Sequence, residues 1–308
     1  MDNRTAAWLL FFCLGVTSFG QAPQEVRLNR AIELFEKGLP PLGIFVSNLS
    51  VRGAASMASS SLDFIIIDLE HSPADLSRLE TYLLGMIDKQ RIVSKGNLQM
   101  GVVPIVRLPS NARERSESLF KQVLDLGAFG ILVPHVNNAE DALAAVEATR
   151  FPQLQGAPDF RPAGHRGVGY GWAARYWGLT GPQYSAKADV WPLDPAGELL
   201  LWLMVESVEA VKNIRPILKT PGVSGVFVGP SDLSFSMGVP LGDPRVEEEI
   251  AKIVAACKET KVPCGTLTAE KEVSDRLKQG FRFLAVGADS GISASVQRSI
   301  EAARATRP

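Results

Sequence analysis

The chain has 308 residues, of which 46% are hydrophobic and 21% are charged, and its formal net charge is −1. This composition is typical of a globular protein with one large or two modest domains, and it excludes a low-complexity or collagen-like chain. The balanced charge gives no support for binding to nucleic acid or to an anionic membrane surface, although a local site can still be basic.

Residues 1–20 have the pattern of an export signal. Arg4 precedes the apolar run AAWLLFFCLGV, which is short for a transmembrane helix. Ser18 and Gly20 then supply the small residues that precede a cleavage site. An uncleaved membrane anchor is the alternative. We expect the signal to be removed, so that residues 21–308 form one periplasmic or secreted domain with no membrane attachment.

Eight apolar segments rich in β-branched residues are predicted strands. They are LGIFVS (42–47), FIIIDLE (64–70), VVPIVRL (102–108), GILVPHV (130–136), LLLWLMVE (199–206), GVFVG (225–229), PCGTLT (263–268) and FRFLAVG (281–287). Helical patterns lie between most of them, over residues 77–90, 115–127, 140–150, 208–218 and 245–261. This alternation predicts an α/β fold with parallel strands, and eight repeats match a closed (β/α)8 TIM barrel. A doubly wound open sheet is the alternative, but no glycine-rich dinucleotide fingerprint follows the first strand.

The segment 151–197 interrupts this alternation because it is long and rich in glycine, proline and aromatic residues. Loops of this length in a compact domain are usually functional or mobile. We expect it to cap the site; a surface excursion or an oligomer contact is the alternative. Cys257 and Cys264 could form a disulfide in an oxidising compartment, although two small buried thiols are the simpler interpretation.

Charged side chains stand at the ends of five successive predicted strands. They are Asp68, Glu70 and His71 at the end of the second strand, Arg107 at the end of the third, His135 at the end of the fourth, Glu206 at the end of the fifth, and Asp232 after the sixth. Because the carboxyl ends of barrel strands share one mouth, we expect these side chains to gather there. Each has a structural explanation if taken alone, such as a helix cap for Asp232 or an ion pair for Arg107.

The residue types in this cluster fit one reaction. Glu206 and Asp232 would leave most of an octahedral shell to water and substrate, which suits Mg²⁺ or Mn²⁺. Arg107 offers a planar fork for a carboxylate or a polarised oxygen. His71, oriented by Asp68, can move protons near neutral pH. Such a set suits a 2-oxo acid, because a metal can chelate the carboxylate and ketone and stabilise an enolate.

A series of motifs extends this interpretation from about residue 40 to 295. In order they are DFIIIDLEHSP, VPIVRLPS, VLDLGAFGILVPHVNNAEDA, HRGVGYG, MVES, PGVSGVFVGPSDLSFSMG and FLAVGADSG. Together they resemble the HpcH/HpaI family of class II, metal-dependent pyruvate aldolases, which act on 4-hydroxy-2-oxo acids and on substrates such as 2-dehydro-3-deoxyglucarate. The resemblance implies a barrel of the phosphoenolpyruvate/pyruvate superfamily, usually a hexamer with an exchanged C-terminal helix. It also implies reversible cleavage to pyruvate, or a related 2-oxo acid, and an aldehyde.

The same resemblance assigns roles to the strand-end residues. It implies Glu206 and Asp232 as ligands of Mg²⁺, Mn²⁺ or Co²⁺, and Arg107 as the residue that binds the pyruvyl oxygens. It implies His71 as the acid/base, assisted by Asp68.

Further residues follow from the resemblance. Asp125, in VLDLGA, matches a family aspartate near the mouth and close to a subunit boundary. Gly229, Pro230 and Ser231 would shape the pyruvate pocket. Glu70 is expected to support the site without reacting.

The chain departs from the family pattern at His135, where members commonly have methionine, and at His165, which precedes Arg166 and Gly167. His135 could contact substrate or pack in the mouth. The aromatic residues of 151–197 could receive a bulky aldehyde or form a subunit contact.

Three functions are compatible with the sequence. The leading one is a metal-dependent aldolase, a carbon–carbon lyase acting on a small 2-oxo acid. A 3-hydroxyacyl-CoA lyase of the citramalyl or malyl type is less favoured, because an exported protein would rarely meet coenzyme A and no basic run suits its phosphates. An exported, non-catalytic oxo-acid-binding protein is the third, and the intact acid/base pair argues against it.

Overall fold

The computed structural model describes residues 26–288 and 294–305, so the predicted signal peptide lies outside the described residues. Eight parallel strands close into a barrel in sequence order, with β8 paired to β1. The strands are β1 (Leu42–Val46), β2 (Phe64–Asp68), β3 (Val103–Arg107), β4 (Gly130–Val133), β5 (Leu200–Val205), β6 (Gly225–Val228), β7 (Cys264–Leu267) and β8 (Phe283–Ala288). Each lies within or close to the bounds of its predicted segment, and the predicted (β/α)8 barrel is confirmed.

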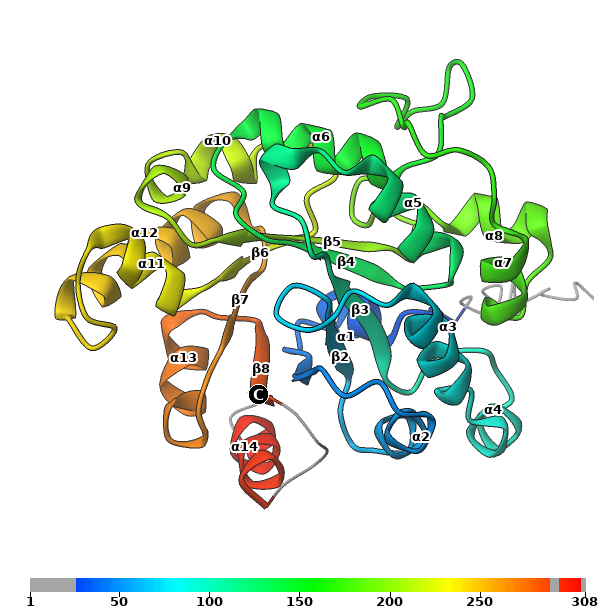
Figure 1. The fold of residues 1–308 in the computed structure, drawn as a ribbon, viewed down its shortest axis with the longest axis horizontal. Helices are drawn as coiled ribbons and strands as arrows, with labels where there is room; N and C mark the ends of the chain where they lie inside the picture. Colours follow the sequence, from blue (N-terminus) through cyan, green and yellow to red (C-terminus); the bar gives the residue numbers. More distant parts are fainter. Residues whose placement is uncertain (1–25, 289–293, 306–308) are drawn as a thin grey trace, which may run out of the picture.

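The helices form a ring outside the strands, except for α1, which lies across one end of the barrel (Figure 1). They are α1 (Arg30–Glu36), α2 (Val51–Ala58), α3 (Leu76–Gly85), α4 (Lys89–Lys95), α5 (Glu117–Asp125), α6 (Ala139–Thr149), α7 (Gly171–Trp177), α8 (Gly181–Lys187), α9 (Val208–Lys212), α10 (Ile214–Leu218), α11 (Pro230–Met237), α12 (Pro244–Thr260), α13 (Val273–Gln279) and α14 (Ala294–Ala305). The helix predicted over 77–90 is two helices, because Asp88 caps a second one by accepting a hydrogen bond from the Arg91 N–H.

The strands are apolar throughout because they are covered on both faces. Every residue of β2, β3 and β5 is buried, as expected for parallel strands between a packed barrel interior and an outer ring of helices. The apolar runs continue to the last residues of the strands, where charged side chains begin. This places the polar chemistry at the carboxyl ends.

Helix α1 closes the opposite, amino-terminal end of the barrel. Its Phe35 ring lies 6.0 Å from the Trp202 ring and 6.2 Å from the Phe283 ring, between centroids. Phe283 in turn stacks on Phe64 at 3.8 Å and on Trp202 at 4.1 Å. These aromatic side chains fill the barrel interior from its amino-terminal end.

The segment 151–197 was predicted to cap the mouth, and this prediction is wrong for Trp177, which packs at the other end of the barrel. Trp177 stacks on Phe129 with ring centroids 4.1 Å apart, and its Nε1 donates to the Gly127 carbonyl at 2.9 Å. Both partners precede β4, at the amino-terminal end of the barrel. The reason is topological: α6 has already returned the chain towards that end before the segment begins.

Two further sequence features have a plain structural outcome. Cys257 and Cys264 are buried free thiols that lie against each other. Within residues 26–288 and 294–305, the helices are too short or too polar for any of them to cross a membrane.

Candidate active site

Arg107 lies at the centre of a charged cluster at the carboxyl ends of the strands. The register between β2 and β3 places it opposite Asp68. Its Nε and Nη2 donate to the two carboxylate oxygens of Asp68 at 2.9 and 2.6 Å, and its Nη1 lies 2.8 Å from Glu70 Oε2. The guanidinium carbon also lies 4.9 Å from the centre of the Phe45 ring. Two carboxylates and one aromatic face therefore fix the guanidinium, a geometry that lysine cannot reproduce.

Asp68 is the partner of Arg107 and not of the His71 imidazole, which corrects the expected contact. Its Oδ1 accepts hydrogen bonds from the backbone N–H groups of Glu70 at 3.0 Å and His71 at 3.3 Å. Burial acts to raise the pKa of Asp68, but the hydrogen bonds and charge of Arg107 hold that pKa below its ordinary value. Asp68 is thus a fixed anion that positions both Arg107 and the loop after β2.

Glu206, directly after β5, is the buried carboxylate of the cluster, with 2% of its surface exposed. Its Oε1 accepts a hydrogen bond from the backbone N–H of His135 at 2.7 Å, and the His135 Nδ1 lies 3.4 Å from the same oxygen. His135 has a φ of 53°, a left-handed conformation that is uncommon for residues other than glycine. This backbone turn aims an N–H group at the Glu206 carboxylate.

The site concentrates negative charge. Burial raises the pKa of Glu206 to about 8, and the nearby charges of Asp232 and Glu70 act in the same direction. Burial also raises the pKa of Glu70, which Arg107 and the two histidines oppose. Two carboxyl groups with raised pKa values, the buried Glu206 and the partly buried Glu70, lie beside the third carboxylate of Asp232 and favour a bound cation.

The donor set fits a hard divalent ion. Glu206 and Asp232 are oxygen donors from the ends of neighbouring strands, and Gly229 rather than Asp232 forms the N-cap of α11. A Cβ at Gly229 would overlap Glu206 Oε2, so this glycine leaves room for the carboxylate. Among the residues that the structure describes, no three or more His, Cys, Asp or Glu side chains form a metal-binding group. The candidate site is a pair of carboxylates that leaves the remaining coordination positions to water and substrate.

His71 lies at the edge of this cluster with an exposed imidazole. Its side chain is 65% exposed, and its Nε2 lies 3.7 Å from Glu70 Oε2. Pro230 and Ser231 line a cavity of about 690 Å³ beside the ends of β7 and β8. The predicted catalytic histidine and the predicted substrate-pocket residues therefore lie on the carboxyl-end side of the barrel, although this cavity is lined by none of His71, Arg107 and Glu206.

Asp125 and His165 are not part of this cluster. Asp125 is the last residue of α5, which has returned the chain to the amino-terminal end of the barrel, and its Oδ1 accepts from Arg166 Nη2 at 2.8 Å. The expected place of Asp125 near the mouth is therefore wrong within one chain. His165 Nδ1 lies 3.3 Å from Glu117 on the outside of the barrel.

Two contacts of the site were not predictable from the sequence. Phe45 lies under Arg107, but in the sequence it is one apolar residue among five in β1. His135 was visible as an unusual residue at a strand end, while its contact with Glu206 depends on a backbone angle that no pattern encodes.

Comparison with known proteins places this geometry in context. Residues 42–295 match the family described as HpcH/HpaI aldolase/citrate lyase. The 2-keto-3-deoxy-L-rhamnonate aldolase of Klebsiella pneumoniae is 35% identical over 82% of this chain and 85% of that protein. The 4-hydroxy-2-oxo-heptane-1,7-dioate aldolase of Shigella boydii is 33% identical over 86% of this chain and 90% of that protein. The crystal structure of an HpcH/HpaI aldolase/citrate lyase family protein from Burkholderia cenocepacia superposes with a TM-score of 0.69 at 28% identity, covering 85% and 93% of the two chains.

Proposed function

The chain belongs to the HpcH/HpaI aldolase/citrate lyase family and is a carbon–carbon lyase, and from this premise we propose its reaction and its site. It cleaves a 4-hydroxy-2-oxo acid reversibly to pyruvate, or a related 2-oxo acid, and an aldehyde. A divalent metal ion, Mg²⁺ or Mn²⁺ with Co²⁺ as a substitute, is held by Glu206 and Asp232. The observation that carries this proposal is the pair of neighbouring carboxylates beside the fixed guanidinium of Arg107.

Arg107 is the proposed binder of the substrate oxygens. Asp68 occupies Nε and Nη2, so Nη1 is the guanidinium nitrogen that a substrate can engage, in place of Glu70. Because Asp68 and Phe45 hold the plane of the guanidinium, this donor is oriented before substrate arrives, which lowers the entropic cost of binding.

His71 is the proposed acid/base. Its exposed imidazole can take the proton of the 4-hydroxyl group when the carbon–carbon bond breaks, and return a proton to the 2-oxo acid. A bound divalent ion would supply a Lewis acid for the negative charge that develops on the substrate oxygen. Glu70, between His71 and Arg107, supports both groups.

The test uses the full chain, stripped of metal with a chelator and resupplied with Mg²⁺, Mn²⁺ or Co²⁺. Exchange of protons for deuterium at the methyl group of pyruvate, followed by NMR, reports proton removal without an aldehyde. We expect metal-dependent exchange that falls by about 10²- to 10⁴-fold in His71→Ala and is lost in Glu206→Gln. His165→Ala is the matched control and keeps the wild-type rate.

The exchange experiment has two outcomes that contradict the proposal. Exchange that continues unchanged after metal removal would exclude a metal-dependent site. No exchange with any of the three metals would point to a thioester lyase or to a binding protein.

Assembly and location are further proposals. We propose a homo-oligomer, a hexamer by family resemblance, in which Asp125 lies close to a subunit boundary. Size-exclusion chromatography with light scattering tests the assembly, and a monomer that is fully active would contradict it. We also propose export with cleavage before Gln21, which N-terminal sequencing of the mature protein would test.

A further inference from the structure

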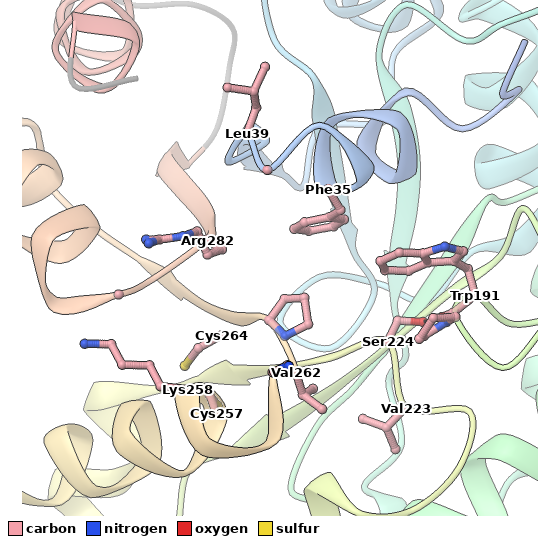
Figure 2. A pocket seen from close by; sticks show the side chains of 15 residues that line it. Phe35, Leu39, Trp191, Val223, Ser224, Cys257, Lys258, Val262, Cys264 and Arg282 are labelled. Carbon is pink, nitrogen blue, oxygen red and sulfur yellow. The ribbon is translucent and has the colours of Figure 1, made fainter. Parts of the chain in front are cut away.

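A second cavity lies at the end of the barrel opposite the proposed active site. Its volume is about 360 Å³, within the range of small-molecule sites. Its lining comes from the segments that enter the strands: Ser224 precedes β6, Cys264 begins β7, Arg282 precedes β8, and Phe35 comes from α1 (Figure 2). The proposed catalytic residues lie at or after the carboxyl ends of strands, so this cavity and the active site share no residue.

One side of the cavity is aromatic and pre-formed. The rings of Phe35 and Trp191 are stacked, with centroids 5.8 Å apart and planes 10° from parallel. The backbone of Trp191 is held on both sides: its N–H donates to the Leu199 carbonyl at 2.9 Å, and its carbonyl accepts from the Ser224 hydroxyl. The flat apolar surface is therefore fixed before any ligand binds.

The other side carries positive charge without a matching carboxylate. Lys258, Lys261 and Arg282 line the cavity, and no acidic residue does so among the described residues. Nη1 of Arg282 donates to the carbonyls of Leu277 and Phe281, so its charge is not neutralised there. Figure 2 shows Lys258 and Arg282 across the cavity from the Phe35 and Trp191 rings.

The position of Lys258 depends on a glycine. Gly280 has a φ of +119°, and a Cβ there would overlap the Cε of Lys258. The lysine side chain therefore lies across the bare backbone of Gly280. This geometry directs the stem of Lys258 along the cavity wall.

We propose that this cavity binds an aromatic carboxylate, with its ring against Phe35 and Trp191 and its carboxylate near Lys258 and Arg282. Charge complementarity carries the assignment: the lining has three cations, no anion and one aromatic wall. An aromatic ring on the Trp191 face gains stacking and apolar burial, and the cations select an acid over a neutral compound. The site does not depend on the proposed aldolase reaction.

The test is isothermal titration calorimetry of the full chain with 2-naphthoate as the probe. We expect one site per chain and at least tenfold weaker binding of the neutral 2-naphthalenemethanol. Lys258→Gln and Arg282→Gln should each weaken binding of 2-naphthoate by about three- to tenfold, and Trp191→Leu should weaken it further. Lys252→Gln is the matched control, because this lysine of the same helix pairs with Glu249 outside the cavity.

A second control distinguishes binding in this cavity from binding at the active site. Glu206→Gln should leave the affinity for 2-naphthoate unchanged, as should saturation with pyruvate and Mg²⁺. The proposal is overturned by the absence of binding, by equal affinity for the neutral compound, or by binding that is insensitive to all three cavity variants. Competition between 2-naphthoate and pyruvate with Mg²⁺ would also overturn the proposal, because it would show that the probe binds at the mouth of the barrel.

Discussion

Replacing Glu206 by glutamine should remove a pH dependence from the stability of the metal-free protein. Burial raises the pKa of this carboxyl from an ordinary 4.5 to about 8. Between these values the folded state keeps a proton that the unfolded state has released. The contribution of Glu206 to the wild-type free energy of unfolding should therefore be fully present below pH 4.5 and be lost as pH rises to 8.

The size of this effect follows from the shift in pKa. One pKa unit corresponds to about 1.4 kcal/mol, so the full difference between pH 4.5 and 8 is at most about 5 kcal/mol. A glutamine side chain at this position would have the same shape without a titrating proton, and this contribution would vanish. Glu209→Gln is the control, because Glu209 is an exposed glutamate in the connection after β5.

The assay is urea unfolding at pH 5, 6, 7 and 8 in the presence of a chelator, with wild type and variants compared at each pH. The wild-type stability should decline relative to that of Glu206→Gln as pH rises, and the Glu209→Gln control should follow wild type. Added Mg²⁺ should restore stability at pH 8 to the wild type only, because a ligand stabilises the state that binds it. Parallel pH curves for wild type and Glu206→Gln would refute the reasoning.

Three further predictions concern the site and its support. Gly229→Ala should weaken Mg²⁺ binding, measured by calorimetry, by about tenfold or more, because the added Cβ would displace the carboxylate of Glu206. Gly242→Ala is the control and should bind Mg²⁺ as the wild type does, because a Cβ at that position meets open space. Arg107→Lys should lower the rate of pyruvate proton exchange by about 100-fold, since lysine loses the bidentate pairing, and a near-wild-type rate would contradict that role. Arg150→Met should lower the free energy of unfolding, measured in urea, by about 3–5 kcal/mol. The reason is that it leaves the buried carboxylate of Asp189 unpaired; in the wild type this carboxylate lies 2.7 Å from the Arg150 guanidinium. A decrease below about 1 kcal/mol would contradict this reasoning.

The barrel and the set of residues at its mouth follow from the pattern of the amino-acid sequence. Apolar runs separated by helical patterns identify strands buried on both faces, and eight of them in alternation leave few topologies. Asp68, Arg107 and Glu206 come together because parallel strands present their carboxyl ends on one side. This is a consequence of connectivity, so it needs no coordinates.

The contacts that those residues make depend on how distant segments pack against one another. The spacing of three residues favoured a contact between Asp68 and the His71 imidazole, but the register of β2 and β3 places Arg107 opposite Asp68. Such a register depends on how two strands far apart in the sequence align.

The remaining differences between prediction and structure concern which end of the barrel a segment occupies. Asp125 and the aromatic segment 151–197 carry no pattern that says which end they occupy. Asp125 is the last residue of α5, and the segment follows α6, and both helices return the chain towards the amino-terminal end. The cavity beside Phe35 and Lys258 is formed from segments distant in the sequence. Its residues become neighbours only when the barrel closes, because closure brings the entries of all eight strands to one end.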